Sequence, residues 1–204
     1  MLTQEQNDLI CRTGPGTPGG EFMRRYWQPV ALAEELPPGG APIPVELLSE
    51  KLTLYRDEHG NPCLIARRCP HRGADLSYGR VEAGGIRCLY HGWKMDVKGR
   101  VIEMVSEPAA SCLASKVQHK AYPVKEWGGM VWAWLGPADE VPDFVPPPWA
   151  PHEKARVSIA KAVIPCNWAQ ILEGAIDSAH SSSLHSSDMV PARVAGGQIG
   201  RAHV

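Results

Sequence analysis

The sequence predicts an α+β protein in which an antiparallel β domain precedes the start of a second, α+β domain. Short apolar runs alternate with turn residues from about residue 43 to 135, a rhythm typical of small antiparallel barrels and sandwiches. The 20 Gly and 19 Pro among 204 residues favour turns over long helices. A helical pattern appears late, at 167–181, where apolar residues recur along one stripe.

The composition excludes several classes of protein. Hydrophobic residues make up 44% and charged residues 21% of the chain, an ordinary globular balance. A formal net charge of −1 provides no electrostatic footprint for nucleic acid or for an anionic membrane surface. No window approaches the roughly 18 apolar residues of a membrane span, and residues 1–12 lack the basic and apolar regions of a secretory signal. The six Cys are therefore expected to be reduced thiols in the cytoplasm.

The expected elements can be placed in order along the chain. Short helices are expected at 3–12 and 20–27, on either side of the breaker run 14–20. Next come a hairpin of 45–48 and 51–55, a turn at 57–61, a returning strand at 62–66 and a buried strand at 129–135. After a Pro-rich stretch, a further strand is expected at 155–164, followed by the helix at 167–181.

Two short segments of the expected β domain each carry one Cys and one His. Sixteen residues separate the pair Cys69 and His71 from the pair Cys88 and His91. Glycines flank both pairs, so tight loops with exposed backbone N–H groups are expected there, adjacent at one end of the domain. Two Cys plus two His form the ligand set of a Rieske [2Fe-2S] centre, with the Cys on one iron and the His on the other.

Structural zinc is the alternative, because a Cys₂His₂ set also binds zinc tetrahedrally. Zinc fingers pair Cys with Cys and His with His, whereas each segment here carries one of each, which favours the cluster. The other Cys have no metal-ligand spacing and are expected to be buried as small apolar side chains: Cys11, Cys63, Cys112 and Cys166. Three His in turn or linker segments are expected to be solvated: His59, His119 and His152.

A second constellation lies on the expected late helix. Asp177 and His180 are three residues apart and so share a helix face, with Glu173 one turn earlier and His185 near the helix end. Two His plus a carboxylate form the facial triad of non-haem Fe(II) oxygenases. Taken alone, an Asp and a His at this spacing are more often a hydrogen bond on a helix surface.

The motif residues resemble those of Rieske non-haem iron aromatic ring-hydroxylating oxygenases, in their alpha (oxygenase) subunit. The similar segments are Cys69–Gly73, Cys88–Trp93, Arg24–Val30, Leu172–His180 and the spacing of Asp177, His180 and His185. The resemblance extends to about residue 197 and is closest to the subgroup that acts on aromatic carboxylates such as phthalate. It implies a [2Fe-2S] cluster held by Cys69, His71, Cys88 and His91. It also implies a mononuclear non-haem Fe(II) held by His180 and His185.

The same resemblance gives Asp177 a role other than ligation. It implies that Asp177 hydrogen-bonds to His180 of its own subunit and to His91 of a neighbouring subunit, and so connects the two metal centres for electron transfer. The carboxylate ligand of the mononuclear iron in this family comes well beyond residue 204. The 204-residue chain is therefore expected to have no oxygenase activity by itself.

The function that the resemblance implies is dihydroxylation, hydroxylation or demethylation of an aromatic substrate with O₂. Electrons from NADH would arrive through a reductase of the flavin and ferredoxin type, and the full-length protein would be a homotrimer. No nucleic acid and no membrane are expected as partners. Two alternatives are a Rieske ferredoxin-type electron carrier without oxygenase activity and a zinc-stabilised binding module, and an iron and sulfide assay distinguishes the latter.

The expected domain boundaries follow from the breaker runs and the motifs. They are 1–39 for an N-terminal segment packing on the catalytic part, 40–140 for the Rieske domain, 141–154 for a Pro-rich linker and 155–198 for the start of the catalytic domain. The last six residues, 199–204, can be back-translated into a common sequencing-adapter sequence. They are therefore expected to be a scar outside the fold.

Overall fold

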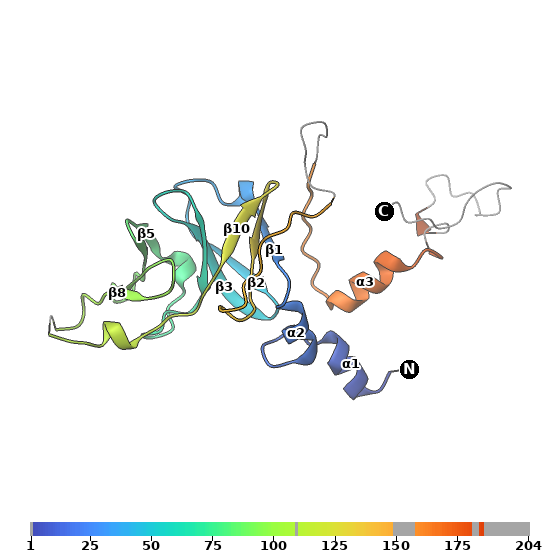
Figure 1. Ribbon diagram of the computed structural model, residues 1–204, viewed down its shortest axis with the longest axis horizontal. Helices are drawn as coiled ribbons and strands as arrows, with labels where there is room; N and C mark the ends of the chain where they lie inside the picture. The colour runs from blue at the N-terminus through green and yellow to red at the C-terminus, as the bar shows by residue number, and fades with distance from the viewer. Residues whose placement is uncertain (1, 109, 149–157, 181–183, 186–204) are drawn as a thin grey trace. The chain divides into compact units, whose positions relative to one another are not determined.

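A computed structural model describes residues 2–108, 110–148, 158–180 and 184–185. The chain divides into two compact units, of which one comprises residues 12–161 and the other residues 1–11 together with 162–204 (Figure 1). Each unit is described by itself below. The predicted boundaries of the domains stay a prediction, and residues 199–204 lie outside the described part of the chain.

The larger unit consists of three antiparallel sheets. One sheet has the order β1 (Gln28–Leu32), β11 (Met130–Ala133), β10 (Val124–Trp127). The second has the order β2 (Ile43–Leu47), β3 (Glu50–Arg56), β4 (Pro62–Ala66), β9 (Ala121–Tyr122). The third has the order β5 (Arg80–Glu82), β6 (Gly85–Arg87), β7 (Lys94–Met95), β8 (Val101–Glu103). The predicted antiparallel β architecture is confirmed.

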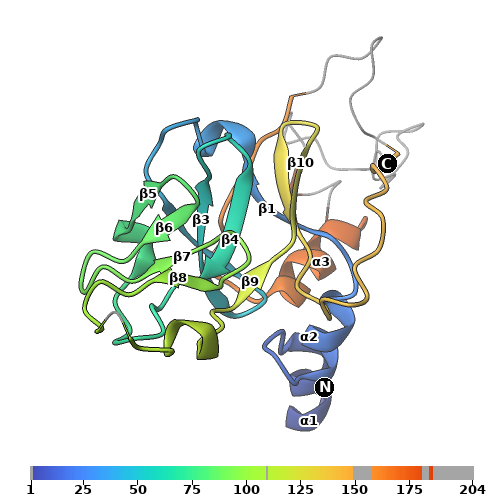
Figure 2. The ribbon, with the colours of Figure 1, turned by 60° about the vertical axis from the view of Figure 1, so that its left-hand side comes forward.

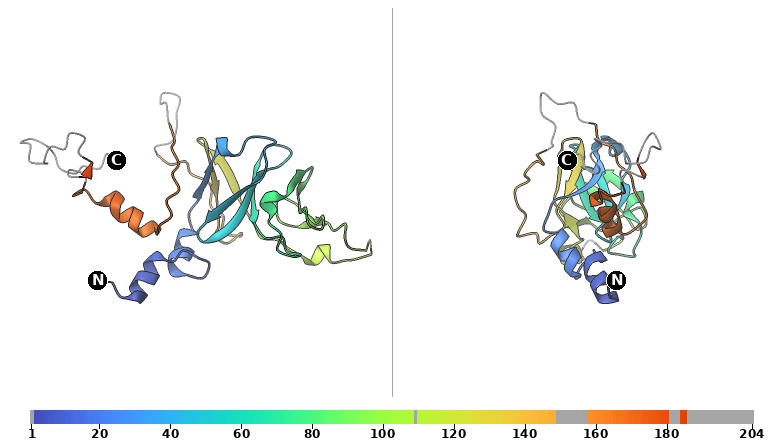
Figure 3. Two further views of the ribbon diagram at one scale, coloured as in Figure 1. Left: turned by 180° about the vertical axis from the view of Figure 1, so that it is seen from behind. Right: turned by 90° about the vertical axis from the view of Figure 1, so that its right-hand side faces the viewer.

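The third sheet lies at one end of this unit, on the side of β3 and β4 that is away from β1 and β10 (Figures 2 and 3). Short helical turns complete the unit: α2 (Pro18–Met23) and the 3-10 turns η1 (Ala33–Glu35), η2 (Leu76–Tyr78) and η3 (Ala114–Lys116). Every strand connection in the third sheet is short, so the loops between its strands are held close together.

Strands β3 and β4 separate two hydrophobic cores. On β4, the side chains of Cys63 and Ile65 enter one core, and Leu64 enters the other. This is the alternation of a strand that is buried on both faces. The first core also contains Cys69 and Cys88, so the side chains of the predicted cluster site rest on the same packed layer as the sheet.

The predicted hairpin and returning strand are confirmed as β2, β3 and β4. Leu47 pairs with Glu50, which leaves a two-residue turn of Leu48 and Ser49. Both turn residues have positive φ, at 46° and 63°, as the twist of a tight two-residue hairpin requires. Neither is Gly, so this turn adopts a conformation that L-residues disfavour.

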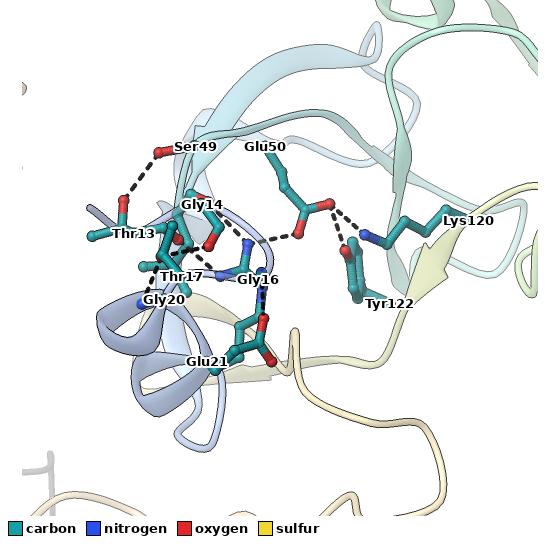
Figure 4. A network of polar contacts seen from close by, with 12 residues as sticks. Thr13, Gly14, Gly16, Thr17, Gly20, Glu21, Ser49, Glu50, Lys120 and Tyr122 are labelled. Atoms are coloured by element: carbon teal, nitrogen blue, oxygen red, sulfur yellow. Dashed lines mark hydrogen bonds and ion pairs between the residues drawn. The ribbon is translucent and has the colours of Figure 1, made fainter. Parts of the chain in front are cut away.

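A buried arginine fastens this turn to the N-terminal segment of the same unit. Figure 4 shows Thr13, Glu50, Lys120 and Tyr122, which belong to the same polar network. Arg24 is 4% exposed and donates to the backbone carbonyls of Thr13 and Leu48 and to the carboxylate of Glu50. Glu50 also accepts hydrogen bonds from Lys120 and Tyr122, both at 2.6 Å. One carboxylate thus links the N-terminal segment, β3 and β9.

The smaller unit contains α1 (Gln4–Cys11) and α3 (Trp168–Ile176), which contact one another. Asn167 caps α3, because its side-chain oxygen accepts from the backbone N–H of Ala169 at 2.8 Å. The prediction that this helix continues to residue 181 is wrong. Asp177 Oδ1 accepts from the N–H of Ala179 at 2.8 Å, and this local turn competes with the helix and ends it at Ile176.

Two other expected elements differ in the structure. The helix expected at 20–27 spans Pro18–Met23 instead, because Thr17 caps it and Pro18 occupies its first turn. The strand expected at 155–164 is absent from the described residues 158–164, where no neighbouring strand pairs with the segment. A strand without a partner leaves its backbone groups unpaired, so the local pattern alone is insufficient.

Several Cys and His side chains also differ from the expectation in how deeply they are buried. Of the four Cys without metal spacing, Cys63 is buried, whereas Cys112 and Cys166 are exposed and Cys11 is half-buried. His59 is exposed as expected, but His119 is buried, and His152 lies outside the described residues. No helix in the described ranges is long and apolar enough to cross a membrane.

Candidate metal centre

The two predicted ligand loops share one pattern of backbone hydrogen bonds. In the first loop, the N–H of Cys69 donates to Ala74 at 2.8 Å, and the N–H of Gly73 donates back to Cys69 at 2.9 Å. In the second loop, Cys88 donates to Trp93 at 2.8 Å. The N–H of Gly92 donates to the carbonyl of Cys88 at 3.0 Å. Each loop is therefore closed by its own backbone, four and five residues after the Cys.

Both closures require a glycine in the left-handed region. Gly73 has a φ of 69° and Gly92 a φ of 71°, where other residues are strained. A Cβ on Gly92 would also lie 2.3 Å from a methyl group of Val105. The glycines that flank the motifs are thus part of the loop geometry, as the sequence suggests.

The structure brings the four predicted side chains of the two loops together. The imidazole rings of His71 and His91 are 4.5 Å apart between centroids and nearly perpendicular, at 69°. Cys69 and Cys88 lie in the same hydrophobic core, and both residues are 3% exposed. The site therefore presents two sulfurs and two imidazoles as two neighbouring pairs.

The donor set fits a [2Fe-2S] cluster. Nδ1 of His71 is buried and has no hydrogen-bond partner among the described residues, a costly state for a polar atom unless a metal or ligand satisfies it. Burial raises the pKa of the Cys69 thiol to about 11, so a metal is needed to hold it as the thiolate. Among the described residues no three His, Cys, Asp or Glu side chains could share one metal ion.

Aromatic rings surround the two His. The indole of Trp93 stacks on the ring of His71 at 4.6 Å and 8°, and its Nε1 donates to Ser106 Oγ at 3.2 Å. Tyr90 lies 3.9 Å from the ring of His91 and is 64% exposed. The sequence places Trp93 in the second motif without a role, and no sequence signal singles out Ser106, which comes close only because the chain folds back after β8.

The second predicted constellation is assembled in part. His180 Nδ1 lies 3.2 Å from Asp177 Oδ2, and the rings of His180 and His185 are 5.1 Å apart. The backbone N–H of Ala179 and then the imidazole of His180 lower the pKa of Asp177, so this carboxylate stays ionised. Asp177 and His180 meet through the turn after α3 and not along a helix face. Glu173 remains within α3, where its backbone carbonyl accepts from the N–H of Asp177 at 3.1 Å.

The fold and the paired loops place the protein in a defined class. The protein-family model described as the Rieske [2Fe-2S] domain matches residues 26–123, a range that contains both loops. A second model, described as LigXa C-terminal domain like, matches residues 133–203. The cofactor of the Rieske domain is a [2Fe-2S] cluster.

The matches to known proteins show which family this is: the chain belongs to the Rieske oxygenase family. It is 62% identical to the phthalate 4,5-dioxygenase oxygenase subunit of Pseudomonas putida, over 97% of this chain and 45% of that protein. It is 43% identical to the 5,5'-dehydrodivanillate O-demethylase oxygenase subunit of Sphingobium sp., over 100% of this chain and 48% of that protein. The chain thus spans about half the length of these curated relatives.

Solved structures agree with this family. One is the oxygenase and ferredoxin complex of carbazole 1,9a-dioxygenase, with 29% identity and a TM-score of 0.68 over 78% of this chain and 41% of that one. Another is dicamba monooxygenase with non-haem iron and dicamba, with 31% identity and a TM-score of 0.53 over 61% of this chain and 38% of that one. The predicted resemblance is confirmed at the level of the family.

Proposed function

We propose that this chain is the Rieske-bearing part of the oxygenase component of a multicomponent oxygenase. The component would dihydroxylate, hydroxylate or demethylate an aromatic carboxylate such as phthalate. The substrate class rests on the 62% identity to the phthalate 4,5-dioxygenase oxygenase subunit. Because the identity extends over 97% of this chain, beyond the Rieske domain, it disfavours a stand-alone electron carrier.

One observation carries the proposal for the first site. The buried, unpartnered Nδ1 of His71 lies in a pair of perpendicular imidazoles beside a pair of buried thiols. Cys69 and Cys88 would hold one iron of the cluster, and His71 and His91 would hold the other. A single tetrahedral zinc would need all four donors around one point, and the described side chains offer no such point.

The second site would bind the mononuclear iron through His180 and His185. When bound, the cluster supplies one-electron transfer and the mononuclear iron supplies O₂ activation. Asp177 would orient His180 through the 3.2 Å contact to Nδ1 and fix which nitrogen of that ring is free for the metal. We further propose that Asp177 contacts His91 of a neighbouring subunit in the full-length protein.

The proposal includes partners and a compartment. A ferredoxin-type protein or an NADH-dependent flavin reductase would donate the electrons, and a solved ferredoxin complex of a related oxygenase supports a donor of this kind. The full-length protein would assemble as a homotrimer, since head-to-tail contacts that serve a neighbour's site close into a ring. None of the six Cys, all of which lie in the described part of the chain, forms a disulfide, which supports the cytoplasm as the compartment.

The test is the metal content of the purified chain. We expect about two irons and two acid-labile sulfides per chain at the first site, with a red-brown visible spectrum. Cys69→Ser should abolish the spectrum and the sulfide, because the cluster loses a thiolate ligand. Cys112→Ser is the matched control, since this thiol is exposed and far from both motifs in the sequence.

Different results of these experiments would contradict the cluster, the ligand assignment or the substrate class. A colourless protein with stoichiometric zinc and no sulfide would refute the cluster. Loss of the cluster in Cys112→Ser to the same extent as in Cys69→Ser would refute the ligand assignment. The substrate is tested on the full-length protein with its reductase, where phthalate turnover is expected and turnover of non-carboxylated aromatics alone would refute the substrate class.

A further inference from the structure

An arginine precedes the cysteine in both ligand loops. Arg68 precedes Cys69, and Arg87 precedes Cys88, while a glycine follows each cysteine at the same distance. In both loops the guanidinium donates from Nη1 to the carbonyl of that glycine, at 3.3 Å to Gly73 and at 2.7 Å to Gly92. The side chain thus closes the loop a second time, outside the two backbone hydrogen bonds.

The two arginines differ in how firmly they are held. Arg68 is exposed, and its attraction to Asp75 acts through space. The side chain of Arg87 is 15% exposed and is fixed on two sides. Its Nε donates to Glu82 at 2.8 Å, and its Nη2 donates to Glu103 at 2.6 Å.

Arg87 therefore uses all three guanidinium nitrogens in separate directions. Glu82 on β5 and Glu103 on β8 hold the group from the two outer strands of the third sheet, and Gly92 receives the third bond. A planar guanidinium with fixed donor directions suits this arrangement, and a lysine ammonium could not reproduce it. Lys94 lies 3.5 Å from Glu103 and 3.9 Å from Glu82, so the carboxylates are also screened from each other.

The hydrogen bond from Arg87 to Gly92 affects the position of a proposed cluster ligand, His91. Gly92 follows His91, so displacement of its peptide would move the imidazole that lies 4.5 Å from His71. Val105 packs close to this glycine, because a Cβ added to Gly92 would lie 2.3 Å from a methyl group of Val105. The position of His91 thus depends on the anchor formed by Arg87, Glu82 and Glu103.

We propose that Arg87 is a positioning residue of the cluster site, which holds the loop 88–92, and with it Cys88 and His91, in the ligating geometry. The inference rests on the proposed function, because it concerns the [2Fe-2S] cluster of that site. It assigns unequal roles to the two arginines: Arg87 determines the geometry of its loop, and Arg68 contributes little to the other.

The experiment uses the full 204-residue chain purified with its cluster. Arg87→Gln should release iron to a ferrous chelator about tenfold faster than the unsubstituted chain, and should shift the EPR g values of the reduced cluster. Arg80→Gln is the matched control: Arg80 pairs with the same Glu82 and lies opposite Arg87 in the sheet, but it is 63% exposed and binds no loop carbonyl in the described structure. Arg68→Gln should resemble this control.

A conservative variant guards against a simple folding defect. Arg87→Lys retains a cation between the two carboxylates but loses the fork, so it should fold, keep a cluster and still shift the g values. Wild-type g values and iron release in Arg87→Lys would overturn the inference, as would equal behaviour of Arg87→Gln and Arg80→Gln. An unsubstituted chain without iron and sulfide would instead overturn the proposed function, and this inference with it.

Discussion

His119 is a buried histidine whose ring contacts the end of β4. It is 5% exposed, and its Nε2 bonds to the carbonyl of Ala66 at 2.8 Å. Burial lowers the pKa of His119 below its usual value, and the bond to Ala66 opposes this shift only in part. The neutral ring is therefore the form that the folded protein accommodates.

The shift implies a loss of stability in mild acid. The unfolded chain takes up the proton near the usual His pKa of about 6.5, whereas the folded chain takes it up at lower pH. The stabilisation is therefore complete above about pH 6.5 and is lost as the pH falls through the folded pKa. We expect the urea midpoint to fall between pH 7 and pH 5, and to fall less in His119→Gln.

The control for that prediction is His59→Gln. The side chain of His59 is 74% exposed, so this variant should follow the pH dependence of the unsubstituted chain. A pH dependence that is unchanged in His119→Gln would contradict the role assigned to His119.

At the scale of elements, the fastening of the β2–β3 turn by Arg24 has a measurable contribution to stability. Arg24→Met should lower the free energy of unfolding by about 3 to 5 kcal/mol, because it leaves Glu50 and two backbone carbonyls without their buried partner. Urea or thermal unfolding followed by circular dichroism measures the change.

Arg25→Met is the matched control for Arg24→Met. Arg25 pairs with Glu140, and both side chains are about half exposed, at 52% and 49%. An exposed pair of this kind contributes at most about 1 kcal/mol. Equal destabilisation by the two substitutions would show that the buried network is no more important than a surface ion pair.

Elements with a strong local pattern could be predicted from the sequence, and those that depend on partners could not. The hairpin and the returning strand at 62–66 are confirmed because alternation and turn residues agree there. The segment 158–164 has strand-forming residues but no neighbouring strand in the described chain. The end of α3 was missed because Asp177 fits a helix by spacing, while its side chain bonds to the next turn.

The ligand loops illustrate the same division within the site. Cys and His at paired spacings, with flanking glycines, indicate the site from the sequence alone. The sequence also shows that both loops contain an Arg, a Cys and a Gly at the same spacing. It does not show that Arg87 is held more firmly than Arg68. Glu103 reaches Arg87 only because β8 pairs beside β7, a long-range arrangement that no local pattern encodes.

At the scale of the whole molecule, the coupling of the two sites would depend on Asp177. In the full-length protein Asp177→Asn should keep both metals, because the proposed ligands are retained, and should keep a reducible cluster. Turnover should fall by orders of magnitude because the charged contact with His180 is lost. Iron stoichiometry and single-turnover reoxidation of the cluster measure these effects together.

Two other results would reassign Asp177. Turnover near that of the unsubstituted protein would mean that Asp177 is only a surface acid, in keeping with its half-exposed side chain. Loss of the mononuclear iron would mean that Asp177 is itself a ligand. Glu173→Gln is the control, since Glu173 lies one turn earlier on α3 and is expected to leave both metals and turnover unchanged.

The closure of both ligand loops by backbone hydrogen bonds has a consequence for how the protein matures. In zinc fingers the metal supplies the free energy of folding, so the apoprotein is unfolded. Here a backbone hydrogen bond from Cys69 to Ala74 orders one loop, and one from Cys88 to Trp93 orders the other. Neither bond involves a metal-ligating atom. We therefore expect the entropy of ordering the loops to be lost when the polypeptide folds, before any iron arrives. Folding and cluster insertion become separable events, and a chain made during iron shortage would wait as a folded template for later loading.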